Sequence, residues 1–325
     1  MKPETHKTHL FRRLRWDDLC KRHIRSLIRT AIDEDTAGLG LKPSLRTPRR
    51  DPSTALIADI ATTATAKIVA RRECVVCGAE LIGAVLAEYA ATQIANTTAA
   101  STNTAAPIAS AQIHVPDGRR VRRNEVIATV SGTAALLLTA ERVMLNFLQR
   151  LSGIATLAAA YAAKLEGTAC RLLDTRKTTP GWRMLEKYAV ATGGGWNHRL
   201  GLFDRVMLKD NHLAAGDAAS GANLAALVRR ARAEFPDLAI ECEVDTRAQI
   251  APVLEAGADV ILLDNFSLTD LRPALAEIAD RAWTEVSGGV TLETLAAIAA
   301  LGPDFVSTGA LTHQAAWVDI GLDWQ

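Results

Sequence analysis

The sequence predicts an α/β protein, with a parallel sheet in its second half and a smaller α+β layer in its first. From residue 170 onward, short apolar runs of strand-like composition alternate with amphipathic segments of helical periodicity, which is the repeat of a parallel sheet or barrel. Several runs end abruptly in polar or glycine-containing segments. The 325 residues suffice for two domains. We expect these at residues 1–140 and 141–325, with the last residues packing back on the first domain.

The first domain is predicted to be a small α+β layer that carries no active-site chemistry of its own. Its expected elements are a helix at 12–34, a strand at 64–77, a helix at 79–94 and a strand pair at 113–115 and 126–130. Two stretches are predicted to be loops: the Gly-, Pro- and Arg-rich segment 36–52 and the low-complexity segment 95–110.

The second domain is predicted to open with a long apolar helix at 136–165 and to continue as strand–helix repeats. Strands are expected near 170–174 and 204–208, and at 238–244, 259–264, 284–287 and 305–308. Helices are expected at 223–235, 246–257, 268–282 and 291–301. Six strands are visible rather than the eight of a complete barrel. The sequence therefore allows an open or incomplete barrel.

Composition excludes several classes of protein. Residues 1–50 carry a net charge of +7, but their arginines alternate with apolar residues at helical spacing, which favours an amphipathic helix over nucleic-acid binding. The sequence lacks a long uninterrupted apolar run and a signal-peptide core, so we expect a cytoplasmic protein with no membrane segment. The five cysteines are scattered, which suits a reducing compartment. Cys74 and Cys77 lack a second pair and are interpreted as packing residues rather than zinc ligands.

Residues 174–212 hold the densest cluster of positive charge. A run of cations is usually the solvated face of a helix, but this one follows an apolar run that ends at Asp174, surrounds the triple glycine 193–195, and includes a second apolar run that ends at Lys209. Glycine permits a close approach of the backbone. We therefore expect the cations to face one cavity and a small polyanionic ligand. They are Arg176, Lys177, Arg183, Lys187, His198, Arg199, Arg205 and Lys209.

The later strand ends supply carboxylates and glycine turns. Glu243 and Asp245 follow one strand and Asp264 the next; each is either a structural partner of a lysine or a ligand for Mg²⁺ and hydroxyl groups. The last two strands end in the segments 287–289 and 308–310, each containing glycine. Such turns present backbone N–H groups to phosphate. In isolation they are equally well explained as tight turns.

The segments DTRKTTPG (174–181), GGGWNHRLGLFD (193–204) and KDNH (209–212) resemble the quinolinate phosphoribosyltransferase family. The resemblance extends through ERVMLNFLQRLSGIAT (141–156) to the ending GLDWQ, and covers about residues 54–325. It implies an incomplete barrel and a homodimer. Segment 36–52 departs from the family pattern as an insertion, after which Asp51 and Thr54 stand in for a Gly-Asp-x-Thr turn.

The resemblance also implies the ligands and the residue roles. The substrates are quinolinate and phosphoribosyl pyrophosphate (PRPP), which brings Mg²⁺, with Glu243 and Asp264 as candidate metal ligands. Lys177, Glu243 and Asp264 are the expected catalytic residues. Arg142 is expected to complete the site of the neighbouring subunit. The other expected substrate-binding residues are Thr175, Arg176, His198, Arg199, Lys209, Ser287, Gly288, Gly289, Thr308, Gly309 and Ala310.

The implied reaction transfers phosphoribose to the pyridine nitrogen and then releases CO₂, giving nicotinate mononucleotide for NAD biosynthesis. Guanidinium groups bind carboxylates through paired hydrogen bonds, and fixed charge with positioning supplies the acceleration. Two alternatives stay open. One is a related transferase with another acceptor, and the other is a non-catalytic ligand-binding protein on the same barrel. Activity with quinolinate distinguishes them.

Overall fold

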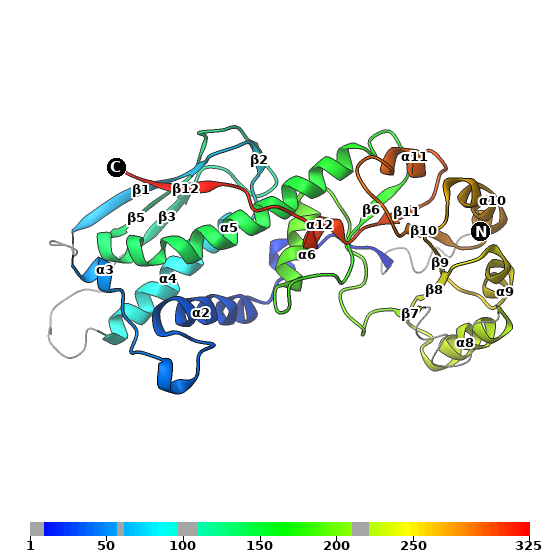
Figure 1. Cartoon of the computed structure of the whole chain (residues 1–325), viewed down its shortest axis with the longest axis horizontal. Coiled ribbons are helices and arrows are strands. Elements are labelled where there is room, and N and C mark those ends of the chain that lie inside the picture. Colours follow the sequence, from blue (N-terminus) through cyan, green and yellow to red (C-terminus); the bar gives the residue numbers. More distant parts are fainter. Residues whose placement is uncertain (1–9, 57–61, 97–108, 210–220) are drawn as a thin grey trace. The chain divides into compact units, whose positions relative to one another are not determined.

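The computed structural model describes residues 10–56, 62–96, 109–209 and 221–325 (Figure 1). The chain forms two compact units, one of Met1–Leu14 with Leu157–Gln314 and the other of Arg15–Thr156 with Ala315–Gln325. This division differs from the predicted boundary at 140/141. Helix α5 (Ala134–Ala163) runs without a break through that position, so the chain passes from one unit to the other within a helix.

The larger unit is built on a six-stranded parallel sheet in the order β6-β11-β10-β9-β8-β7. Its strands are β6 (Arg171–Leu173), β7 (Val206–Leu208), β8 (Ile240–Val244), β9 (Val260–Asp264), β10 (Trp283–Ser287) and β11 (Phe305–Ser307). Strands consecutive in sequence from β7 onward are neighbours, and β11 lies beside β6. This is the order of a ring that lacks one hydrogen-bonded join, between β6 and β7, among the described residues. The predicted α/β class is confirmed.

A helix follows each of these strands (Figure 1); the first and the last of these helices were not predicted, and the other four lie where the periodicity predicted helices. The helices are α6 (Arg183–Thr192), α8 (Gly221–Glu234), α9 (Ile250–Glu255), α10 (Leu268–Ile278), α11 (Leu295–Ala299) and α12 (Ala310–His313). Several are shorter than predicted, because one-turn 3-10 segments precede α9 and follow α10.

The smaller unit contains an antiparallel sheet in the order β12-β1-β5-β3. Its strands are β1 (Thr63–Ala70), β3 (Ser110–Ile113), β5 (Val126–Thr133) and β12 (Ile320–Trp324), and a separate pair joins β2 (Cys74–Val75) to β4 (Arg120–Val121). The last strand of the chain pairs with β1. The expected strand at 64–77 is thus two strands, interrupted at residues 71–73. Cys74 and Cys77 are buried cysteines that are not in a disulfide.

Three helices besides α5 complete this unit: α2 (Lys21–Ala37), α3 (Pro52–Ala55) and α4 (Ala79–Asn96). The predicted helix at 12–34 therefore begins nine residues later than expected. Within the predicted loop 36–52, residues 38–51 are irregular, with one 3-10 turn at Pro43–Leu45, while α2 and α3 include its two ends. Asp51 ends it by accepting a hydrogen bond from the Thr54 amide (3.1 Å) and another from the Thr139 hydroxyl (3.0 Å). Most of the low-complexity segment 95–110 lies outside the described residues.

Helix α5 is long and apolar enough to cross a membrane by length and composition alone. However, 61% of its most apolar window is buried inside the protein, with side chains such as Leu145, Leu151 and Ile154 wholly covered. A helix that is apolar all round is expected in the core of a large protein as well as in a membrane. Its burial here identifies α5 as a core helix.

The N-terminal segment 10–14 closes one end of the parallel sheet. Leu10 and Phe11 share a core with Ala239, Val260, Trp283 and Phe305, which stand at or just before the starts of β8 to β11. Phe11 stacks on Phe305 with ring centroids 3.6 Å apart. The segment was expected within the N-terminal domain, but its apolar side chains cover the end of the sheet opposite to the strand C-termini.

Replacing Phe11 by Ala is expected to lower the free energy of unfolding by about 3–5 kcal/mol, because it removes a buried aromatic ring and leaves a cavity under the sheet. Urea denaturation followed by fluorescence measures the change. The matched control is Phe235→Ala at a half-exposed ring, which we expect to shift stability by less than about 1 kcal/mol. Equal effects of the two substitutions would show that Phe11 does not close the core.

Candidate active site

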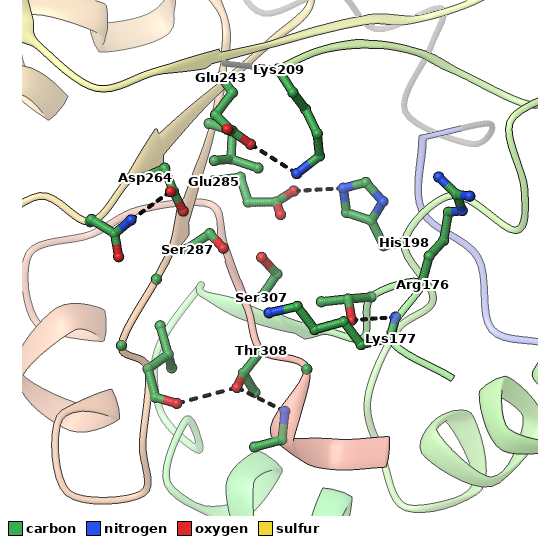
Figure 2. Close-up of a pocket in the computed structure, with 18 of the residues that line it drawn as sticks. Arg176, Lys177, His198, Lys209, Glu243, Asp264, Glu285, Ser287, Ser307 and Thr308 are labelled. Atoms are coloured by element: carbon green, nitrogen blue, oxygen red, sulfur yellow. Dashed lines mark hydrogen bonds and ion pairs between the residues drawn. The ribbon is translucent and has the colours of Figure 1, made fainter. Parts of the chain in front are cut away.

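One cavity of about 840 Å³ lies at the C-terminal ends of the parallel strands (Figure 2), the position where this class of fold places its active sites. A volume of this size suits small-molecule ligands. Every predicted site residue except Arg142 lines it: Thr175, Arg176, Lys177, His198, Arg199, Lys209, Glu243, Asp264, Ser287, Gly288, Gly289, Thr308, Gly309 and Ala310. All belong to the larger unit, so this unit alone forms the cavity.

The cationic side of the cavity depends on a buried hydrogen-bonded centre at Asp174. Its carboxylate accepts hydrogen bonds from Lys187 Nζ (2.5 Å), the His198 amide (2.8 Å) and Asn197 Nδ2 (2.8 Å). Asp174 and Lys187 are fully buried. This centre joins the end of β6, which carries Arg176 and Lys177, to the segment that carries His198 and Arg199. The four cations are thereby held on one wall.

Three of the cations expected at the cavity do not line it. Lys187 is the buried partner of Asp174, and burial lowers its pKa while Asp174 opposes that shift. Arg205 is also buried, where it pairs with Glu241 (2.6 Å) and donates to the backbone oxygen of Leu10. Arg183 donates to the Thr178 hydroxyl (3.1 Å). These residues build the wall rather than present charge to a ligand.

The triple glycine serves packing against α6. A Cβ atom at Gly195 would lie 2.7 Å from Val190 Cγ1, closer than atoms tolerate. The close approach predicted from the glycines is therefore an approach to a neighbouring helix. This close packing lets Trp196 form a parallel β-bridge with Leu173, the last residue of β6. The bridge places the next residues, Asn197 and His198, at the cavity wall.

A cluster of buried charge lies beneath this wall. His198 Nε2 is 3.1 Å from Glu241 and 3.3 Å from Glu285, and Arg205 binds the other side of Glu241. All four side chains are buried. The ligand atoms of His198, Glu241 and Glu285 are close enough to share a metal ion. The Arg205 guanidinium already neutralises Glu241, which makes this cluster an ion-pair network.

The two carboxylates determine the charge of His198. Burial lowers the pKa of His198, whereas the carboxylates of Glu241 and Glu285 raise it. The carboxylates prevail, and the pKa is raised from the ordinary 6.5 to about 9. Nδ1 lies 2.7 Å from the Arg199 amide, and accepting that hydrogen bond requires the neutral ring. The two buried carboxylates favour the charged ring at neutral pH, whereas the contact with the Arg199 amide favours the neutral ring with Nδ1 as acceptor.

The opposite side of the cavity carries carboxylates. Glu243 at the end of β8 forms an ion pair with Lys209 (3.1 Å), and Asp264 at the end of β9 accepts a hydrogen bond from Asn265 (2.7 Å). Carboxylate oxygens of Glu243, Asp245 and Asp264 lie within 4.8 Å of one another. A set of oxygen ligands at this spacing fits a hard divalent cation such as Mg²⁺.

The glycine turns form the remaining rim. Gly288 and Gly289 have φ of 84° and 60°, and a Cβ at Gly288 would lie 2.1 Å from Asn265 Oδ1, so glycine is required. At the next turn a Cβ at Gly309 would lie 2.6 Å from Lys177. Only the second turn leads directly into a helix, the short α12, whereas α11 begins at Leu295. At the first turn, the positive potential that a helix N-terminus would add for binding a phosphate is therefore small.

Arg142 does not line this cavity. It lies on α5 within the smaller unit, its side chain is 66% exposed, and it pairs with the adjacent Glu141 (2.9 Å). Asp210, Asn211 and His212 of the predicted KDNH segment lie outside the described residues.

Sequence reasoning missed several lining residues. They are Glu285, Asn265, Ser307, Thr291, His313 and Gln314. Glu285 had a detectable signal, since it is two residues before Ser287 on β10 and therefore shares its face of the sheet. The others lie one to four residues from predicted ones, mostly in turns, where periodicity does not indicate direction.

The fold and the cavity together define an α/β enzyme with a cation-lined cavity that suits small polyanions. Residues 154–323 match the C-terminal domain of quinolinate phosphoribosyl transferase, and residues 51–152 match its N-terminal domain. The chain belongs to the quinolinate phosphoribosyl transferase family.

Known relatives agree with this membership. The chain is 45% identical over 211 residues to a probable nicotinate-nucleotide pyrophosphorylase (carboxylating) of Bacillus subtilis, covering 65% of this chain and 72% of the relative. It is 45% identical over 212 residues to the corresponding Mycobacterium leprae protein, covering 64% and 73%. The solved nicotinate-nucleotide pyrophosphorylase of Francisella tularensis superposes with a TM-score of 0.80 at 30% identity, covering 96% of this chain and all of that one.

The charged state of His198 gives a testable pH dependence. Its folded pKa of about 9 is above the ordinary 6.5, so the ion pairs contribute fully below pH 6.5 and are lost as pH rises through 9. We expect the free energy of unfolding to fall by at most about 1.4 kcal/mol per pH unit across this window.

Denaturation at several pH values and NMR titration of the His198 ring measure the two effects. Glu241→Gln should lower the titration midpoint. A midpoint near 6.5 in the unaltered protein would contradict the assigned charge.

Proposed function

We propose that this protein is a decarboxylating quinolinate phosphoribosyltransferase. It transfers phosphoribose from PRPP to quinolinate, and the products are nicotinate mononucleotide, CO₂ and pyrophosphate for de novo NAD biosynthesis. The observation that carries the proposal is the cavity at the strand ends, which is lined by four cationic side chains on one wall and by the carboxylates at the ends of β8 and β9. The names of the relatives support the same activity.

The cationic wall is assigned to quinolinate, whose two adjacent carboxylates need closely spaced donors. Arg176 and Arg199 offer planar guanidinium groups for paired hydrogen bonds. Burial, and then the neighbouring Arg176, lower the pKa of Arg199. The second of these causes is the repulsion between two cations on the same wall. His198 and Lys209 add charge on either side. Thr175 supports the wall, since its hydroxyl accepts a hydrogen bond from the Lys177 amide (3.1 Å).

The opposite rim is assigned to PRPP. The backbone N–H groups of the turns 287–289 and 308–310 suit its 5′-phosphate. Glu243 and Asp264 suit the ribose hydroxyls and the Mg²⁺ that accompanies the pyrophosphate. Lys177 extends from the cationic wall to lie against Gly309 of the opposite rim, where it can neutralise the pyrophosphate or the ring carboxylates as they react.

In this arrangement the enzyme acts by positioning and fixed charge. Pyrophosphate leaves the anomeric carbon with the electron pair of the broken C–O bond. The pyridine nitrogen, held in line by its carboxylates, attacks that carbon and becomes positively charged. The carboxylate next to this nitrogen then leaves as CO₂, because the pyridinium stabilises the electron pair left on the ring. No covalent bond to the protein is required.

The proposal includes a homodimer in the cytoplasm, with Arg142 of one subunit completing the cavity of the other. Arg142 is on the surface of its own unit and its one ion pair joins it to its sequence neighbour Glu141. An exposed pair of this kind contributes little stability. The side chain can therefore turn to an anionic ligand of a second copy at small cost.

The decisive assay combines the protein with Mg²⁺, PRPP and quinolinate and measures nicotinate mononucleotide and CO₂. Activity with nicotinate in place of quinolinate would identify a related transferase of different acceptor. Binding of quinolinate without turnover would identify a ligand-binding protein. Either result contradicts the proposal.

Arg176→Ala is expected to weaken quinolinate binding by at least about 100-fold, the loss that follows removal of a charged hydrogen bond of roughly 3 kcal/mol. Calorimetry measures the affinity, and thermal unfolding verifies the fold. The control is Arg230→Ala, a surface arginine paired with Glu234 on α8. Near-normal affinity in Arg176→Ala would refute the assignment of this wall.

Subunit complementation tests Arg142. Arg142→Ala and Arg176→Ala are each expected to be inactive, whereas a mixture of the two, dissociated and reassociated, should recover about one quarter of the wild-type activity. Recovery follows because each mixed dimer contains one cavity with both arginines intact. If Arg142 serves its own subunit, the mixture stays inactive.

A further inference from the structure

We propose that Glu285 is a further catalytic residue, whose carboxylate stabilises the positive charge that passes from the ribose to the pyridine ring. It stands on β10 in register with Leu262, and through it with Glu243 on β8. The side chain lies in the middle of the cavity and points toward His198 (Figure 2). The inference rests on the proposed function.

The carboxylate of Glu285 is buried without the hydrogen bonds that such a group needs. The residue is 0% exposed, and neither of its oxygens accepts a hydrogen bond from the described part of the chain. The nearest cation is His198 Nε2 at 3.3 Å. By contrast, Lys209 and Asn265 donate to Glu243 and Asp264. A buried carboxylate lacking donors is costly, which points to a ligand that satisfies it.

The chemistry of the two substrates limits what that ligand group is. Quinolinate presents two carboxylates and a ring nitrogen, and PRPP presents phosphate oxygens, all of which are acceptors or anions. Glu285 repels these groups. In the proposed function the Mg²⁺ that accompanies PRPP is held by Glu243 and Asp264, so the remaining partners of Glu285 are the ribose hydroxyls and the positive charge that appears only during reaction, first at the anomeric carbon and then on the ring nitrogen. A carboxylate placed against that charge favours the transition state over the bound substrates.

A purely structural role for Glu285 is already filled by Glu241. Glu241 lies 3.1 Å from His198 Nε2 and is held by Arg205 at 2.6 Å. His198 therefore has a well-supported carboxylate partner without Glu285. The second carboxylate lines the cavity, whereas neither Glu241 nor Arg205 does. Its charge is directed at the ligand space.

The step is one of charge stabilisation and transfers nothing to the protein. The C–O bond to pyrophosphate breaks and its electron pair leaves with pyrophosphate. The lone pair of the ring nitrogen forms the new N–C bond. The C–C bond to CO₂ then breaks, its pair stays on the ring carbon, and a proton from water takes the vacated position. Glu285 forms no covalent bond in any of these steps and transfers no proton.

The test is Glu285→Gln, which keeps the shape of the side chain and removes its charge. We expect kcat to fall about 100- to 1,000-fold, as when one preorganised charge-stabilising group is removed, while the dissociation constants of quinolinate and PRPP stay within about threefold. Nicotinate mononucleotide, whose ring is cationic, should bind at least about tenfold more weakly. Glu285→Asp keeps the charge and should recover part of kcat. Glu234→Gln on the exposed end of α8 is the control.

Calorimetry with each ligand and steady-state kinetics provide the measurements, and thermal unfolding verifies that each variant is folded. A kcat within twofold of wild type in Glu285→Gln overturns the inference. So does an equal weakening of quinolinate and nicotinate mononucleotide, which would indicate a positioning role through His198. If the wild-type protein itself makes no nicotinate mononucleotide, the proposed function fails, and this outcome is distinct from an active wild type with an equally active variant.

Discussion

The hydrogen-bonded centre at Asp174 is the constraint on which the rest of the cavity depends. A fully buried carboxylate is stable only if it is paired and hydrogen-bonded, and here Lys187, Asn197 and the His198 amide meet that need. Satisfying Asp174 therefore fixes two chain segments against each other. Arg176 and Arg199, whose mutual repulsion would otherwise separate them, are held together by an anion that no ligand touches.

A second set of buried contacts supports the wall of the cavity from the opposite end of the sheet. The N-terminal segment caps the sheet with Leu10 and Phe11, and the Leu10 carbonyl accepts a hydrogen bond from Arg205. Arg205 holds Glu241, and Glu241 faces His198. Apolar packing at the closed end of the sheet thus supports an ion pair, which in turn supports a residue of the cavity wall. Charge at the site is positioned by groups that water does not reach, so solvent screens it little.

The sequence predicted the site best where the position of a residue along the chain also determines its position in the fold. Residues that follow the strands of a parallel sheet share one edge, which is why Lys209, Glu243 and Asp264 were predicted together and line one cavity. It was least informative where the partner is distant in sequence. Lys187 looks like a surface cation until Asp174 is seen, and segment 10–14 has no local signal that it belongs to the larger unit. Glu285 sits inside an apolar run, where periodicity gives its face but not its neighbours.

The three carboxylates in the cavity, Glu243, Asp264 and Glu285, differ in the hydrogen-bond donors that the protein gives them. Glu243 and Asp264 stand at strand ends, where Lys209 and Asn265 reach them, so their charge is partly compensated before any ligand arrives. Glu285 is deeper in its strand, and its ion-pair partner among the described residues is the His198 imidazole, which Glu241 also contacts. A cavity that binds anions through cations also needs, for a reaction through a cation, a carboxylate that stabilises this charge, which is the role proposed for Glu285. The Glu285 side chain is buried, so solvent screens its charge little.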